Sequence, residues 1–200
     1  MKKAVLLSMA IALFSLLLGC LETVRHFERD EELELERLNW GKIAILPFTG
    51  IPAFQRVSAE LFSFHMCKQK HFVIIEPAIA EIELKKQRIE LSKIQIKIEQ
   101  AQKAGQILGV DAVIVGSVTI KKGEFPNLGR LVAGVSLTNV STGKVVATSI
   151  CSVPIQRVYG EHKVLQEATE GVANDILSIL YELAGETWNS PQKGIVTKQE

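Results

Sequence analysis

The chain has 200 residues, a formal net charge of +1 at pH 7 and 47% hydrophobic residues. The near-neutral charge argues against strong electrostatic attraction to nucleic acids or acidic surfaces. The length is sufficient for one domain with its own hydrophobic core.

The N-terminal residues have the pattern of an export signal. A start with two lysines precedes an apolar run over residues 4–18 that contains only two serines. A membrane-spanning helix needs about 20 apolar residues, so this run has the length of a signal-peptide core instead. It ends in Gly19-Cys20, which resembles the cleavage site of lipoprotein signal peptidase. The pattern predicts a signal peptide over residues 1–19 and a covalent lipid on Cys20. The alternative is an uncleaved membrane anchor.

Charge and turn residues divide the rest of the chain. Residues 20–39 are dense in charge and predict a lipidated N-terminus with a solvated, partly helical tether. Residues 40–185 alternate apolar runs with turn residues and predict one folded domain. Residues 186–200, rich in Ser, Pro, Gln, Lys and Gly, predict a disordered tail.

Strands and helices alternate in the first half of the domain. Residues 42–48 and 72–75 are short apolar runs that predict buried strands. Between them, a spacing of three and four predicts a helix from Pro52 to about Gln69. The apolar side chains expected on its buried face are Phe54, Val57, Leu61 and Phe64.

Two more helices precede a third strand. Pro77 begins the first of these helices, and Ser92 to Gln95 has the spacing of a capping box for the second. Gly109 stands where a helix C-cap glycine is expected. Residues 111–120 then predict a strand that is apolar on both faces at its start.

The second half predicts a hairpin and a long helix. Residues 131–138 and 145–153 are apolar runs separated by a turn segment, which is typical of an antiparallel hairpin. A helix is predicted over residues 163–184, ending at Gly185. The fold class is therefore mixed α/β (α+β), with a mixed sheet of about five strands packed against helices.

Several segments carry a family resemblance. The blocks 42–48, 71–76, 104–119 and 137–146 resemble the curli-assembly lipoprotein (CsgG) superfamily, most tellingly in Leu-Gly-Val-Asp-Ala at 108–112 and Thr-Gly-Lys at 142–144. The superfamily includes the curli secretion channel and LpoB-like activators of penicillin-binding proteins. The channel inserts two long amphipathic hairpins per subunit. Here residues 77–108 read as helical and residues 121–129 as a loop, so the resemblance implies the domain core without the pore.

Two groups of residues are candidates for metal or redox sites. His65, Met66 and Cys67, followed by His71, have the composition of a soft-metal cluster. Residues two apart do not share a helix face, however, so we expect no metal site and no cofactor. Cys67 and Cys151 remain once Cys20 carries lipid. They either pair in an oxidising compartment or are two small, buried, unpaired apolar residues, and we favour the second.

No catalytic motif stands out. Asp111 is either a functional carboxylate or, as we favour, a residue that fixes the turn entering its strand. Ser117 and Thr119 alternate along a strand without a Gly-x-Ser-x-Gly elbow. Gly105, Gly109, Gly116 and Gly123 do not form a dinucleotide-binding loop. Gly109 is expected to cap a helix, and Gly116 is expected at a close-packed position of its strand.

These observations favour a protein that is not an enzyme. We expect a lipoprotein anchored in the outer membrane and facing the periplasm, because Leu21, rather than the aspartate that retains some lipoproteins in the inner membrane, follows Cys20. It would act as an assembly, scaffold or activator module for another envelope protein, with no nucleic-acid partner. The alternative is a subunit of an oligomeric secretion channel related to curli export.

Overall fold

The computed structural model describes residues 23–30, 40–91, 96–122, 129–155 and 161–186. The predicted signal peptide, Cys20, the capping sequence at 92–95, Gly123 and residues 187–200 of the predicted tail lie outside these ranges. None of the described helices is both long and apolar enough to cross a membrane.

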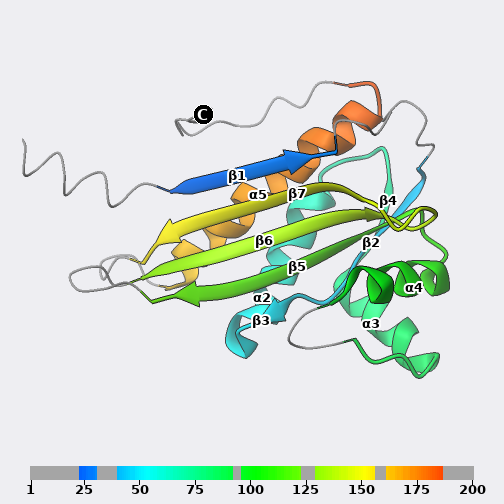
Figure 1. Ribbon diagram of the computed structural model, residues 1–200, viewed down its shortest axis with the longest axis horizontal. Helices are drawn as coiled ribbons and strands as arrows, with labels where there is room; N and C mark the ends of the chain where they lie inside the picture. Colours follow the sequence, from blue (N-terminus) through cyan, green and yellow to red (C-terminus); the bar gives the residue numbers. More distant parts are fainter. Residues whose placement is uncertain (1–22, 31–39, 92–95, 123–128, 156–160, 187–200) are drawn as a thin grey trace, which may run out of the picture.

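A seven-stranded mixed sheet forms the centre of the domain, in the order β1-β7-β6-β5-β2-β4, with β3 paired to β5 (Figure 1). The strands are β1 (Val24–Arg29), β2 (Lys42–Ile45), β3 (Thr49–Gly50), β4 (Val73–Ile75), β5 (Ala112–Lys121), β6 (Arg130–Asn139) and β7 (Val145–Pro154). The fold class is confirmed, and the two strands beyond the predicted five are β1 and β3.

The chain order explains the pairing. β2 is parallel to β4 and to β5, as expected for strands connected by helical crossovers, and β5, β6 and β7 form an antiparallel meander. The four helices in the described residues are α2 (Pro52–Met66), α3 (Pro77–Lys86), α4 (Ile98–Leu108) and α5 (Glu161–Leu183). The first crossover runs from β2 through α2 to β4, and the second returns from β4 through α3 and α4, past β2, to β5. The two crossovers therefore run in opposite directions across the sheet, and right-handed connections place α2 on one face and α3 with α4 on the other.

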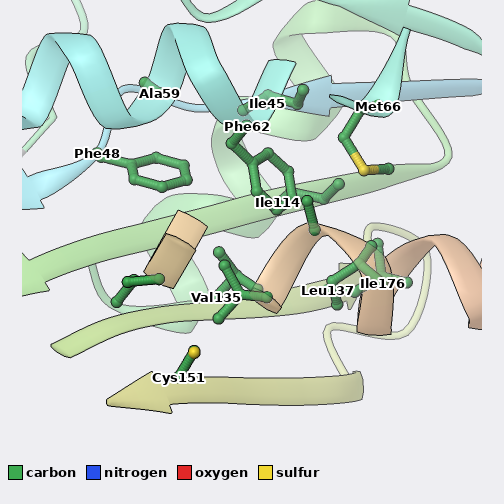
Figure 2. Close-up of a cluster of buried hydrophobic side chains, with 14 of the residues drawn as sticks. Ile45, Phe48, Ala59, Phe62, Met66, Ile114, Val135, Leu137, Cys151 and Ile176 are labelled. Carbon is green, nitrogen blue, oxygen red and sulfur yellow. The ribbon is translucent and has the colours of Figure 1, made fainter. Parts of the chain in front are cut away.

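The larger core lies between the sheet and the helices α2 and α5. Phe62 of α2 packs against Phe48, with ring centroids 5.5 Å apart, and Leu137 of β6 lies in the same cluster as Ile176 of α5 (Figure 2). One apolar face of α5 is buried: Leu165, Ala168, Val172, Ile176 and Ile179 are buried, and Leu183 is partly buried at its end. A smaller cluster under α3 and α4 fills the opposite face beside β2 and the start of β5.

The predicted buried face of α2 was wrong in part. Val57 and Phe64 are exposed, whereas Ser58, Ala59 and Phe62 are buried. The helix packs against both the sheet and α5, and its buried residues include the small side chains of Ser58, Ala59 and Ser63. A search for large apolar side chains at helical spacing selects the neighbouring stripe instead.

The predicted tether also differs from the structure. Val24–Arg29 forms the edge strand β1 and pairs antiparallel with β7. Four of its six residues are charged or titratable (Arg25, His26, Glu28 and Arg29), and an edge strand tolerates this because it has one free edge and its faces are only partly covered. Part of the charged segment therefore belongs to the folded domain.

Candidate interaction surface

One face of the sheet has no helix over most of its area. In Figure 1, α5 and α2 lie behind β1, β7 and β6, and none of the described helices crosses in front of these strands. The cross-strand register shows which side chains share that face. We call this surface the open face, and its residues are Val24, His26 and Glu28 of β1; Thr148, Ile150 and Ser152 of β7; Arg130, Val132, Gly134 and Ser136 of β6; and Ser117, Thr119 and Lys121 of β5.

The centre of the open face lacks charge. Ile150 is 36% exposed and is flanked across the register by His26 and by Gly134, which contributes no side chain. Beside them, the hydroxyls of Ser136 and Thr148 lie 3.3 Å apart. In an antiparallel sheet, apolar core-facing residues usually alternate along each strand with polar solvent-facing residues, many of which are charged. Here hydroxyl and aliphatic side chains occupy the middle instead.

Charged groups surround this centre. His26 Nε2 and Glu28 Oε1 are 2.8 Å apart on β1, with both side chains more than half exposed. Arg130 donates from Nε to the Ser152 hydroxyl at 2.8 Å and from its terminal nitrogen to the Ser152 carbonyl at 2.7 Å. An uncharged centre with a polar rim is the usual composition of a protein–protein interface.

Side chains on the opposite face of β1 fix this strand to the domain. Thr23 Oγ1 donates to Glu167 Oε1 of α5 at 2.6 Å, and Arg29 forms two 2.9 Å contacts with the Glu182 carboxylate. Between these contacts, Arg25 reaches the space between β7 and α5, next to Gly171. The strand is thus attached along its whole length, which makes its outer residues a stable part of the open face.

A buried polar group lies beneath the same strands. Ser149 donates to Asp175 Oδ2 at 2.6 Å. Burial raises the pKa of Asp175 above 3.8, while the Ser149 hydrogen bond and the charge of Arg25 oppose that rise. Burial likewise raises the pKa of the Cys151 thiol to about 11, so this thiol is a poor nucleophile at neutral pH. The Ser149–Asp175 hydrogen bond connects β7 to α5.

The structure separates the residues considered as a metal cluster. His65 is buried, and burial lowers its pKa, whereas Cys67 is exposed. His71 instead lies against Tyr181, with ring centroids 5.2 Å apart, and 3.3 Å from Glu186. Within the described ranges, no group of three or more His, Cys, Asp or Glu side chains is placed to hold a metal ion. Cys67 and Cys151 are both free, which confirms that they do not pair, but the expectation that both are buried was wrong for Cys67, which is exposed after the end of α2.

The other singled-out residues have structural roles. Asp111 Oδ2 accepts hydrogen bonds from the backbone N–H groups of Gly41 and Lys42, at 2.7 and 2.9 Å, and so fixes the start of β2. Gly116 lies under Phe48, whose ring would be 2.2 Å from an added Cβ. Gly109 ends α4 at φ 62°. Ser117 and Thr119 belong to the open face, which could not be predicted because its sequence pattern resembles any solvent-facing strand surface.

Comparison with known proteins gives structural likeness only. No family model matches the chain, and no curated protein matches it. Among solved structures, the PelC dodecamer from Paraburkholderia phytofirmans is similar at 17% identity and a TM-score of 0.45, over 79% of this chain and 96% of that chain. Lipoprotein GNA1162 from Neisseria meningitidis is similar at 18% identity and a TM-score of 0.48, over 68% and 98%.

A third similar structure is the LpoB C-terminal domain from Escherichia coli, at 11% identity and a TM-score of 0.43, over 57% of this chain and 83% of that chain. At these identities and scores, none of the three decides what this chain does. The candidate surface is therefore judged on its own residues.

Proposed function

We propose that the protein is a lipid-anchored lipoprotein of the outer membrane, facing the periplasm, and that it acts without catalysis as a docking module for another envelope protein. The open face would be the surface that binds the partner. The single observation that carries this proposal is the uncharged, partly aliphatic centre of that face around Ile150, with charged groups only at its rim. Association at such a face buries apolar area without burying an unpaired charge.

The anchor rests on the sequence around Cys20. Gly19-Cys20 follows a signal-peptide core, so the processed chain would begin with a cysteine that carries diacylglycerol and an acylated amine. Several acyl chains, at about 0.8 kcal/mol per buried CH₂, hold a protein stably on a bilayer. Mass spectrometry of the protein purified from membranes should show this modification, and Cys20→Ser should leave an unlipidated precursor. Palmitate labelling of the Cys20→Ser protein would contradict the assignment.

Photo-crosslinking in intact cells tests the docking role. A photoreactive amino acid replaces Ile150 on the open face or, as a matched control, Ile98 on α4, which is 51% exposed. We expect a discrete crosslinked product from position 150 that position 98 does not give. The proposal is wrong if the two positions give the same products or if neither gives any.

A further inference from the structure

The start of β1 lies close to the lipidated cysteine that we propose. Val24 begins β1, and Cys20 is four residues earlier. Even a fully extended chain spans only about 3.3–3.6 Å per residue, so Cys20 lies within about 14 Å of Val24. The domain therefore has almost no freedom to move away from the bilayer once the cysteine is lipidated.

The sheet register identifies the end of the domain that this short connection holds. Val24 pairs with Ser152 of β7. Two residues further along β7, toward the anchor, Pro154 pairs with Arg130 of β6, which in turn pairs with Lys121 of β5. At about 3.3–3.4 Å per strand residue, this last row extends roughly 7 Å beyond Val24. In Figure 1 this end of the sheet, where β5 ends and β6 begins, lies on the left.

Basic side chains gather at the same end. Lys121 and Lys122 at the end of β5 are exposed, and Arg130 stands opposite Lys121 on β6. Lys163 also lies there, one turn before Glu167, which accepts the hydrogen bond from Thr23. The polar headgroup layer on each side of a bilayer is about 5–7 Å thick. With Cys20 at the level of the headgroups, these side chains are within reach of lipid phosphates.

We propose that this basic end, formed by Lys121, Lys122, Arg130 and Lys163, is a membrane-binding surface that contacts anionic lipid headgroups and holds the domain in one orientation, with the strands rising from the bilayer. The proposal rests on the lipidated Cys20 of the proposed function. Each basic residue near an anionic surface strengthens its attraction roughly fivefold. The open face then stands sideways to the membrane, where a neighbouring envelope protein can reach it.

The chain supplies its own control for a test of this orientation. Cys67 is exposed and lies between the end of α2 and the start of β4. The first residue of β4, Val73, pairs with Lys42 at the end of the sheet opposite the basic residues. Ten residues of β5 separate the two ends, about 30 Å. A fluorophore on Cys67 therefore reports on the distant end. A fluorophore on Lys122→Cys in a Cys67→Ser background reports on the basic end.

The labelled, full-length lipidated protein is reconstituted in phosphatidylcholine vesicles with phosphatidylglycerol and a headgroup-quencher lipid. We expect strong quenching of the fluorophore at position 122 and only background quenching of the fluorophore at position 67. Lys121→Ala with Lys163→Ala should weaken the attraction about 25-fold and reduce quenching at 122. The matched pair Lys70→Ala with Lys144→Ala, at the opposite end, should leave it unchanged.

Lengthening the tether distinguishes the effect of the lipid anchor from the effect of the basic residues on membrane contact. With a flexible Gly/Ser insertion of about twenty residues before Thr23, quenching at position 122 should persist on anionic vesicles and disappear on neutral ones. Equal quenching at 122 and 67 in the lipidated protein would overturn the orientation alone. If mass spectrometry finds no lipid on Cys20, the anchor of the proposed function fails together with this inference.

Discussion

Gly171 on α5 lies directly against Cys151 on β7, and a Cβ atom at position 171 would come within 2.7 Å of the Cys151 Sγ. No real Cβ makes such a contact, so the absence of a side chain sets how closely α5 approaches the sheet. In Gly171→Ala, overpacking should lower the free energy of unfolding by about 1–3 kcal/mol. The higher helix propensity of alanine should offset about 0.8–1.0 kcal/mol of that loss.

The paired variant checks this explanation. Cys151→Ala removes the sulfur that the new methyl group would meet, so Gly171→Ala should cost less in that background than in the wild type. Urea unfolding followed by circular dichroism measures all four proteins of the cycle. Equal costs in both backgrounds would show that another contact limits the approach of α5.

Asp175 gives the stability a defined pH dependence. Burial raises its pKa in the folded state above 3.8, so the folded state binds its proton more tightly than the unfolded chain does. The resulting penalty is absent below both pKa values and grows as the pH rises from about 3.8 through the folded-state value. Asp175→Asn should therefore gain stability relative to wild type between pH 3.5 and pH 7, a range of roughly three to four units.

Unfolding curves at several pH values measure this difference for the wild type and Asp175→Asn. Ser149→Ala is the control, because it removes the hydrogen bond that favours the charged form and should increase the penalty at pH 7. A constant difference between wild type and Asp175→Asn across this pH range would contradict the role assigned to burial.

The two thiols of the folded domain should react very differently. Cys67 is exposed, whereas Cys151 is buried with a pKa of about 11. A thiol reagent at pH 7 should modify Cys67 alone in the native protein and both residues in denaturant, because only the thiolate is nucleophilic. Cys67→Ser should abolish the native reaction. Rapid modification of native Cys151, or a mobility shift on reduction, would argue against this packing.

Asp111 should contribute to stability through the start of β2. Its carboxylate accepts two backbone hydrogen bonds, from Gly41 and Lys42. Hydrogen bonds to charged groups contribute about 1.5–3 kcal/mol, so Asp111→Ala should destabilise the fold by roughly that amount. Asp111→Asn keeps an acceptor oxygen and should cost less in thermal unfolding. A cost of Asp111→Asn equal to that of Asp111→Ala would mean that the charge alone matters.

The elements that could be predicted from the sequence are those with a regular apolar pattern and clear turn residues at both ends. The hairpin of β6 and β7 and the helix α5 have regular apolar periodicity and clear turn residues, so both were found close to their observed bounds. Asp111 and Gly116 were likewise assigned structural roles that their contacts confirm. Local pattern is enough where one face of an element is buried against one partner.

Two features needed tertiary information. In β1, Arg25 and Arg29 face α5 while His26 and Glu28 face outward, so the strand shows no apolar alternation that would separate it from a charged tether. The open face was missed for the related reason that hydroxyl and aliphatic residues are ordinary on a strand. Its meaning depends on which strands are neighbours and which helices leave it uncovered.

The most direct test of the docking role is the mass of the native assembly. The lipidated protein is extracted from membranes in mild detergent and analysed by native mass spectrometry as wild type, Ile150→Glu and Ile98→Glu. A buried, unpaired carboxylate is costly, so Ile150→Glu should release a single folded chain while wild type and Ile98→Glu remain in a larger complex. A wild-type protein that is alone, or an Ile150→Glu protein that keeps its complex, would contradict the proposal that the open face binds a partner.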